Sequence, residues 1–202
     1  SDQELALLGG PRAVTLDAGD LFRWPPVTVE DEEAVLAVLR AGSMSDGDIT
    51  TLFEAEYAAY QGTRYGLAFC NGTAAILSAM FGCHVGRGDE IIAPSLTYWA
   101  SALPAFSLGA TVVFADIEPE SLCIDPRDLE HRITPRTKVI VVVHYCGHPA
   151  EMDPIVAIAR KHGVKVIEDV SHAHGSLYRG RLTGAIGDVA AMSLMSGKSL
   201  PA

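Results

Sequence analysis

Lys198 and the residues before it form the part of the sequence best suited to chemistry. The lysine follows Ser193 within the segment 191–198, and an earlier apolar run ends in the acid pair Glu168 and Asp169. A buried acid, a serine at a strand end and a loop lysine, in this order, suit an enzyme that holds pyridoxal phosphate as a Schiff base. The sequence therefore predicts Lys198 as the catalytic residue.

Asp169 is the candidate partner of the ring nitrogen. A carboxylate at the buried end of a strand is costly unless it is paired. A protonated pyridine nitrogen is a suitable partner, because the pairing keeps the ring cationic and able to act as an electron sink. Two alternatives stay open. Asp169 could cap the next turn, or an acid could bind zinc with His172 and His174, although no further ligand set accompanies this H-x-H spacing.

The segment 71–75, Asn-Gly-Thr-Ala-Ala, is a candidate phosphate site. It lies where a predicted strand turns into a helix, so free N–H groups and the positive end of the helix dipole meet there. Gly72 lets the backbone approach an anion, and Thr73 adds a hydroxyl. The alternative is an ordinary Asn/Thr helix cap.

Two further segments follow predicted strands and could contact a ligand. The stretch 94–99 contains Tyr98 and Trp99, either of which could stack on a flat ring, with core packing as the alternative. The stretch 144–149 closes the most apolar run and could line a substrate pocket. A Cys–His pair within it could also suggest nucleophilic catalysis, but we interpret Cys146 as a buried cysteine of a turn.

The segment 196–199, Ser-Gly-Lys-Ser, looks like the end of a P-loop. The full pattern requires a glycine five positions before Gly197, and the chain has Met192 there. No G-x-G-x-x-G motif occurs either. A nucleoside-triphosphate site is therefore rejected, and a dinucleotide fold of the usual kind has no support.

The elements that must position these residues alternate along the chain from Tyr65 onward. Strands are predicted near 65–70, 90–93, 111–115, 138–143, 164–168 and 189–193, and helices near 73–84, 98–108, 126–132 and 152–162. The alternation predicts an α/β fold with a mostly parallel sheet flanked by helices. Ligands of such sheets bind at the carboxyl ends of the strands, where the candidate residues fall.

An irregular arm is predicted over 1–29, followed by two amphipathic helices near 30–41 and 50–60. Thr28 is suited to cap the first helix. The Gly- and Ser-rich stretch 41–48 between the helices reads as a loop. We expect the arm to be separate from one large domain over 30–202.

The composition is typical of a soluble globular protein, with 49% apolar and 20% charged residues. A net charge of -10 argues against a general nucleic-acid binder. The four cysteines form no C-x-x-C pair, so reduced thiols are expected. No secretory signal or membrane-spanning run is visible, which gives the cytoplasm as the expected location.

Taken together, the motifs resemble the DegT/DnrJ/EryC1/StrS family of pyridoxal-phosphate aminotransferases. The resemblance runs from about Gly42 to Ala202. It rests on Asn-Gly-Thr-Ala-Ala at 71–75, Gly-Asp-Glu-Ile-Ile at 88–92, Pro-Ser-x-Thr-aromatic at 94–98, Pro-Ala-Glu-Met-Asp at 149–153, Glu-Asp-x-Ser-His-Ala-His-Gly at 168–175, Gly-Asp at 187–188 and Ser-x4-Lys at 193–198.

The resemblance implies the large domain of the fold-type-I transferases, with the C-terminal domain absent from this sequence. It implies that Lys198 is the Schiff-base lysine, that Asp169 pairs with the pyridine nitrogen and that Tyr98 stacks on the ring. It places the phosphate on Gly72, Thr73 and Ser193, and His172 near the ring hydroxyl. A homodimer with shared active sites is also implied.

The implied reaction is a ping-pong transfer of an amino group from glutamate or glutamine to a keto sugar, which we expect to be carried on a nucleotide. A keto-cyclitol such as scyllo-inosose, or an aminohydroxybenzoate synthase-like reaction, is the alternative. A non-catalytic binding or regulatory fragment of this fold is the second class of function. No metal is expected.

Overall fold

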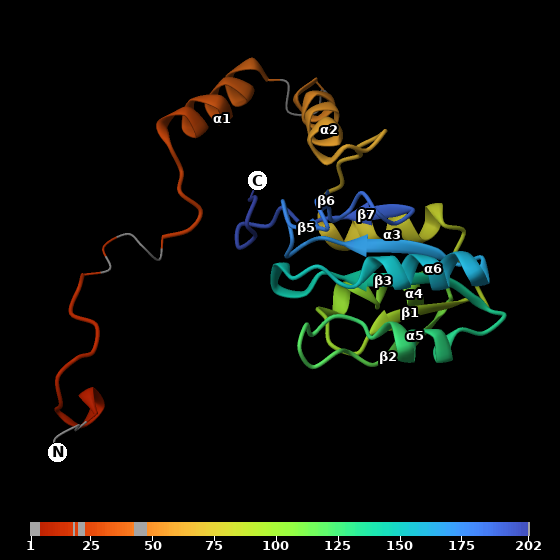
Figure 1. The fold of residues 1–202 in the computed structure, drawn as a ribbon. Helices are drawn as coiled ribbons and strands as arrows, with labels where there is room; N and C mark the ends of the chain where they lie inside the picture. Colours follow the sequence, from red (N-terminus) through yellow and green to blue (C-terminus); the bar gives the residue numbers. More distant parts are fainter. Residues whose placement is uncertain (1–4, 18, 20–22, 43–47, 202) are drawn as a thin grey trace.

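A five-stranded parallel sheet forms the centre of the computed structural model, which describes residues 5–17, 19, 23–42 and 48–201. The sheet order is β2-β1-β3-β4-β7 (Figure 1). The strands are β1 (Glu90–Pro94), β2 (Thr111–Ala115), β3 (Thr137–Val143), β4 (Lys165–Asp169) and β7 (Val189–Ala191). All four pairings are parallel, so the carboxyl ends of the strands meet at one edge, as predicted.

Helices cover both faces of this sheet. On one face lie α3 (Gly72–Gly82) and α4 (Pro104–Ser107), and on the other lie α5 (Pro126–Arg132) and α6 (Met152–His162) (Figure 1). The strands are apolar on both sides, because alternate residues serve alternate faces. In β3, Val139 and Val141 face α3, whereas Ile140 and Val142 face α6. The predicted α/β class is confirmed.

The N-terminal part contributes short or isolated helices outside the two layers (Figure 1). They are the 3-10 turn η1 (Ala6–Leu8), α1 (Val29–Ala41) and α2 (Asp48–Gln61). Thr28 caps α1 in a reciprocal capping box with Asp31, as the pattern predicts. Residues 1–4, 18 and 20–22 of the predicted arm, and 43–47 of the predicted loop, lie outside the described residues. No helix in the described part of the chain is long and apolar enough to cross a membrane.

The strand predicted over 65–70 is wrong. The segment is extended but belongs to no sheet, and Tyr65, Leu67 and Phe69 are 71%, 74% and 45% exposed. Its tie to the rest of the chain is a hydrogen bond from the Ala68 N–H to Glu54 Oε1, at 2.7 Å. A strand needs a neighbour to satisfy its backbone groups, and the described residues place none beside it.

The helix predicted over 98–108 is also wrong as a single element. It is divided into η2 (Trp99–Ser101) and α4, with Pro104 at the first position of α4. Proline suits the first turn of a helix but not its interior, because it lacks an N–H to donate. A short hairpin that the sequence analysis did not predict, β5 (Leu177–Tyr178) and β6 (Arg181–Leu182), follows β4. A turn at Arg179 and Gly180, both with positive φ, joins its strands.

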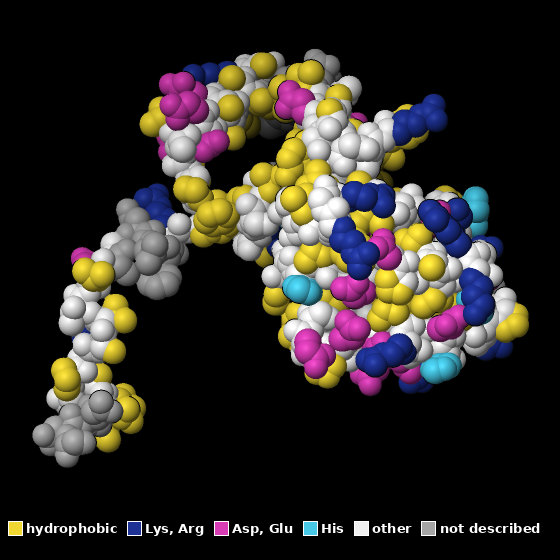
Figure 2. Space-filling model, in the orientation of Figure 1, with side chains coloured by type: hydrophobic (Ala, Val, Ile, Leu, Met, Phe, Trp, Pro, Cys, Tyr) yellow, Lys and Arg dark blue, Asp and Glu magenta, His cyan; other side chains and the backbone are white. Residues whose placement is uncertain are grey.

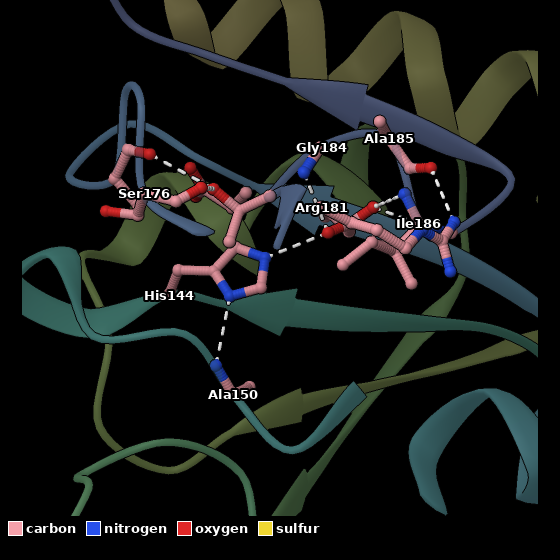
Figure 3. A network of polar contacts seen from close by, with 12 residues as sticks. His144, Ala150, Ser176, Arg181, Gly184, Ala185 and Ile186 are labelled. Atoms are coloured by element: carbon pink, nitrogen blue, oxygen red, sulfur yellow. Dashed lines mark hydrogen bonds and ion pairs between the residues drawn. The ribbon is translucent and has the colours of Figure 1, made fainter. Parts of the chain in front are cut away.

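One buried carboxylate fixes the turn between this hairpin and β7. Glu168, fully buried near the end of β4, accepts hydrogen bonds from the backbone N–H groups of Gly184 (2.8 Å), Ile186 (2.8 Å) and Gly187 (2.6 Å). His144 Nε2 lies 3.0 Å from the same carboxylate. Figure 3 shows His144 between this group and the Ala150 amide.

The hydrogen bonds also define the charge states of the pair. His144 Nδ1 accepts from the Ala150 N–H at 3.1 Å, so the proton of a neutral ring is on Nε2 and is donated to Glu168. Burial alone would raise the pKa of Glu168. The bonds from His144, Gly187 and Gly184 outweigh it and lower that pKa below its ordinary value of 4.5.

We expect Glu168→Gln to lower the free energy of unfolding by about 3 kcal/mol, because an amide NH2 then faces buried N–H donors. The native contribution is present above pH 4.5 and is lost as the pH falls through the lower folded pKa, so the variant should lose less stability in acid than the wild type does. Denaturant unfolding between pH 7 and pH 3 measures both effects. Glu130→Gln, at an exposed ion pair with Lys161, is the control and should stay near the wild type. Equal unfolding curves for Glu168→Gln and the wild type would contradict this account.

Candidate active site

Asp169 ends β4 on the face opposite to Glu168, because successive strand residues point to opposite sides of the sheet. The side chain is 5% exposed. Its Oδ2 accepts from Ser101 Oγ at 2.7 Å, and its Oδ1 accepts from the Ser171 N–H at 3.1 Å. The turn-capping alternative is therefore realised. Each oxygen keeps a further lone pair that a ring N–H could use.

Ser101 connects Asp169 to the aromatic segment. Since Ser101 gives its proton to Asp169, the Thr97 hydroxyl, 2.8 Å away, donates to Ser101. The sequence analysis missed Ser101, because the residue fell inside a predicted helix and carried no motif. Its position in η2 places the Ser101 hydroxyl where it donates a hydrogen bond to Asp169.

The two candidate stacking residues lie beside each other. Tyr98 and Trp99 are 59% and 51% exposed, and their ring centroids are 5.1 Å apart. Trp99 lines an open groove of about 350 Å³ at the start of α3, together with Asn71, Thr73, Ala74, Leu77, Leu103, Pro104 and Ser107. Tyr98 is not part of that lining, so the two aromatic rings serve different surroundings.

The predicted phosphate cup comes together at the start of α3. Asn71 caps the helix, with Oδ1 accepting from the Ala74 N–H at 2.9 Å. Within the described residues, the N–H groups of Gly72 and Thr73 have no protein acceptor. A Cβ on Gly72 would lie 2.9 Å from the Ser193 Cβ, so only glycine allows this contact. The helix cap is thus present, and the two N–H groups and the close approach of Gly72 to Ser193 are consistent with the predicted phosphate site.

His172, Lys198 and Asp169 share one electrostatic environment. Burial lowers the pKa of His172, the Lys198 ammonium lowers it further, and the Asp169 carboxylate opposes both. The ring is therefore neutral at neutral pH. In the described part of the chain, its Nδ1 is buried without a hydrogen-bond partner, and the ring meets Tyr145 edge-on with centroids 5.9 Å apart.

This set of groups fits pyridoxal phosphate. Two unpaired amides, a hydroxyl and a glycine that permits close approach suit a phosphate. A buried acid with unused lone pairs suits a protonated ring nitrogen. A partly buried lysine beside a neutral imidazole suits an attack on a carbonyl carbon. The structure brings Gly72 against Ser193, and both Lys198 and Asp169 lie near enough to His172 to act on its pKa.

The zinc alternative loses one of its ligands. Both ring nitrogens of His174 are engaged, Nδ1 with the Tyr57 hydroxyl and Nε2 with the Ser193 carbonyl oxygen, each at 2.9 Å. Among the described residues, no three His, Cys, Asp or Glu side chains are placed to hold a metal ion.

The backbone of the Lys198 loop has a contact that sequence analysis did not find. Trp24 Nε1 donates to the Lys198 carbonyl oxygen at 3.0 Å, and the Lys198 N–H donates to the Met195 carbonyl oxygen at 2.8 Å. A tryptophan of the arm therefore holds the loop that carries the lysine. The two residues are far apart in the chain and share no motif, so no local pattern could have linked them.

Comparison with known proteins identifies the class that these features define. The model of the DegT/DnrJ/EryC1/StrS aminotransferase family matches residues 26–202. The chain belongs to this family.

The chain is 40% identical over 179 residues to the spore coat polysaccharide biosynthesis protein SpsC of Bacillus subtilis, covering 89% of this chain and 46% of SpsC. It is 39% identical over 184 residues to the L-glutamine:2-deoxy-scyllo-inosose aminotransferase of Streptoalloteichus tenebrarius, covering 88% and 43%. The chain thus spans about half the length of the curated relatives it matches.

Solved structures agree. An aminotransferase from Psychrobacter cryohalolentis superposes with a TM-score of 0.86 and 37% identity, over 88% of this chain and 46% of that one. The PLP form of Spr1654 from Streptococcus pneumoniae has a TM-score of 0.83 and 30% identity, over 88% and 50%. The predicted family is confirmed, and this neighbour has been solved with the cofactor that the sequence analysis predicts for the chain, pyridoxal phosphate.

We expect Gly72→Ala to weaken binding of pyridoxal phosphate by about tenfold or more. The new Cβ, at 2.9 Å from the Ser193 Cβ, would push the two walls of the cup apart, and overpacking of this kind costs about 1–3 kcal/mol. A spectroscopic titration measures the affinity. Gly82→Ala is a matched control at the other end of α3, where a Cβ meets nothing within 4 Å. Similar affinities of the two variants would argue against a cup at Gly72.

Proposed function

We propose that this chain supplies the cofactor-binding part of an aminotransferase that moves an amino group from glutamate or glutamine to a nucleotide-linked keto sugar. The proposal is supported by the close contact of Gly72 with Ser193 and by the position of Asp169 at the end of β4, with Lys198 near enough to His172 to act on its pKa. The relatives named as aminotransferases support the reaction class.

Pyridoxal phosphate, when bound, supplies an electrophilic carbon and an electron-withdrawing ring. In this proposal Lys198 Nζ holds the cofactor covalently and, once free, moves a proton to and from the substrate carbon. Asp169 holds the proton of the ring nitrogen. Gly72, Thr73 and Ser193 hold the phosphate.

Two residues complete the proposed cofactor contacts. His172, kept neutral by burial and by the Lys198 charge, donates to the ring hydroxyl without adding a second positive charge. Tyr98 stacks on the ring, and Trp99 faces the adjoining groove. A neutral imidazole matters here, because a charged one would oppose the positive charge that Asp169 stabilises on the ring nitrogen.

The domain assignment is part of the proposal. Residues 30–202 form the cofactor-binding large domain, and 1–29 form an arm that reaches the Lys198 loop through Trp24. The chain spans about half the length of its curated relatives, and the proposed activity is that of a whole protein.

A homodimer with shared sites is the proposed assembly. In the structure α1 has no buried residue, and its side chains Val35, Leu36 and Leu39 are 61%, 42% and 52% exposed. Figure 2 shows hydrophobic side chains along this helix. An exposed apolar surface of this kind is typical of an interface, and we propose that a second copy of the chain buries it.

The cytoplasm is the proposed location. All four cysteines, Cys70, Cys83, Cys123 and Cys146, lie in the described part of the chain and are free. Cys146 is exposed, so the expectation that it is buried in its turn is wrong. Burial raises the pKa of the Cys83 and Cys123 thiols, which keeps them protonated. Unpaired thiols suit a reducing compartment.

Borohydride treatment in the presence of pyridoxal phosphate should fix the cofactor on Lys198. The expected result is one labelled peptide by mass spectrometry, with Lys198→Ala unlabelled. Lys138, Lys161 and Lys165 are internal controls; Lys161 and Lys165 are held in ion pairs on the surface, away from the sheet edge. Label spread over all the lysines, or its persistence in Lys198→Ala, would refute the role of Lys198.

The similarity to an inosose aminotransferase favours a keto-cyclitol as the second candidate acceptor. We expect amino transfer from glutamate or glutamine to nucleotide-linked keto sugars to exceed transfer to scyllo-inosose by at least tenfold in kcat/KM. A panel of both acceptor classes, with each donor, measures this ratio. A ratio that favours the cyclitol would select the second candidate. A protein that is labelled on Lys198 but aminates neither class would point to the non-catalytic alternative.

A further inference from the structure

Helix α2 reaches the candidate site through a chain of two polar contacts. The Tyr57 hydroxyl lies 2.9 Å from His174 Nδ1, and His174 Nε2 lies 2.9 Å from the Ser193 carbonyl oxygen. The Tyr57 and His174 rings meet edge-on, with centroids 6.5 Å apart. Tyr57 also lies 2.8 Å from Met192 Sδ, next to Ser193. Neither Tyr57 nor His174 is used in the proposed reaction.

The direction of these hydrogen bonds follows from their chemistry. A carbonyl oxygen only accepts, so His174 Nε2 carries a proton and donates it to Ser193. In the neutral ring Nδ1 then accepts, and the Tyr57 hydroxyl donates to it in preference to the weakly accepting sulfur of Met192. Burial, followed by the neighbouring Tyr60, raises the pKa of Tyr57 to about 12, so the hydroxyl keeps its proton.

The rest of α2 is placed to support this chain. Glu54, Tyr57, Ala58 and Gln61 form one stripe at helical spacing, and they are its less exposed residues. Glu54 accepts from the Ala68 N–H, and Gln61 donates to the Thr183 carbonyl oxygen. The contacts made by α2 therefore fall on the loops that surround the sheet edge, and the contact through His174 is the one that reaches Ser193.

We propose that Tyr57 and His174 are positioning residues, which hold the Ser193 backbone against Gly72 and so set the width of the phosphate cup. The inference rests on the proposed function, because it concerns the same phosphate site. Ser193 packs against Gly72 too closely to admit a Cβ, so a small shift of the Ser193 backbone changes the width of the cup. Its N–H, which donates to Ser171 Oγ at 3.1 Å, fixes one side of the residue, and His174 fixes the other.

Isosteric variants separate the two contacts of His174. A glutamine amide can take the place of Nε2 and keep the bond to Ser193, whereas an asparagine amide takes the place of Nδ1 and keeps only the bond to Tyr57. We expect His174→Asn to weaken the binding of pyridoxal phosphate about tenfold and Tyr57→Phe to weaken it less. The affinity of His174→Gln should stay near that of the wild type. Tyr60→Phe, on the same helix, is the matched control.

Two readouts distinguish positioning from general support of the fold. Binding of pyridoxal, which lacks the phosphate, should be unchanged in all variants, and so should the unfolding temperature of the ligand-free protein to within a few degrees. Amide hydrogen exchange of a peptide spanning 192–199, without ligand, should be faster in His174→Asn and unchanged in His174→Gln.

The possible failures are distinct. A wild-type protein that does not bind pyridoxal phosphate refutes the proposed function, and hydrogen exchange still decides whether His174 holds the Ser193 segment. A wild type that prefers pyridoxal phosphate over pyridoxal, with the preference intact in His174→Asn, overturns the inference alone. Equal losses for both ligands in His174→Asn and His174→Gln would show a merely structural role and overturn it as well.

Discussion

The buried carboxylate of Glu168 is the interaction on which the site depends. A fully buried charge is tolerated only when it is fully hydrogen-bonded, and here three backbone amides and His144 meet that requirement. Those amides belong to the turn that leads into β7. By binding them, Glu168 fixes where β7 starts, and therefore where the segment that carries Ser193 and Lys198 leaves the sheet.

The neighbouring acid, Asp169, differs from Glu168 in how many of its hydrogen bonds the protein supplies. Among the residues that the structure describes, its oxygens accept from Ser101 and Ser171 alone, so Asp169 retains a capacity for hydrogen bonds to a ligand that Glu168 lacks. The two acids differ because strand alternation sends one toward α6 and the other toward α3. On the α3 side the backbone comes close only because Gly72 has no Cβ. Of these two successive acids, Glu168 has its hydrogen bonds made by the protein and supports the fold, whereas Asp169 has spare lone pairs and faces the site.

The sequence predicted best what depends on local signals. The bounds of α5 and α6 agree with the prediction, because Asp125 and Pro126 open α5 and Gly163 closes α6. The strand at 65–70 failed, because strands depend on neighbours that a local pattern does not reveal. Ser101, Tyr57 and Trp24 were missed for the same reason: their contacts join distant segments, and serine, tyrosine and tryptophan have no spacing that marks such contacts.

The two histidines after β4 show how the structure resolves what spacing leaves open. His172 and His174 lie two residues apart, and their spacing alone treats them alike, as possible metal ligands, although the family resemblance singles out His172. His174 is satisfied at both nitrogens by the protein, which makes it part of the framework. His172 has a buried nitrogen without a partner, in the described part of the chain, and a lowered pKa beside Lys198. An unsatisfied polar group is costly in a scaffold but useful in a binding site, so the incomplete histidine is the one to associate with the ligand.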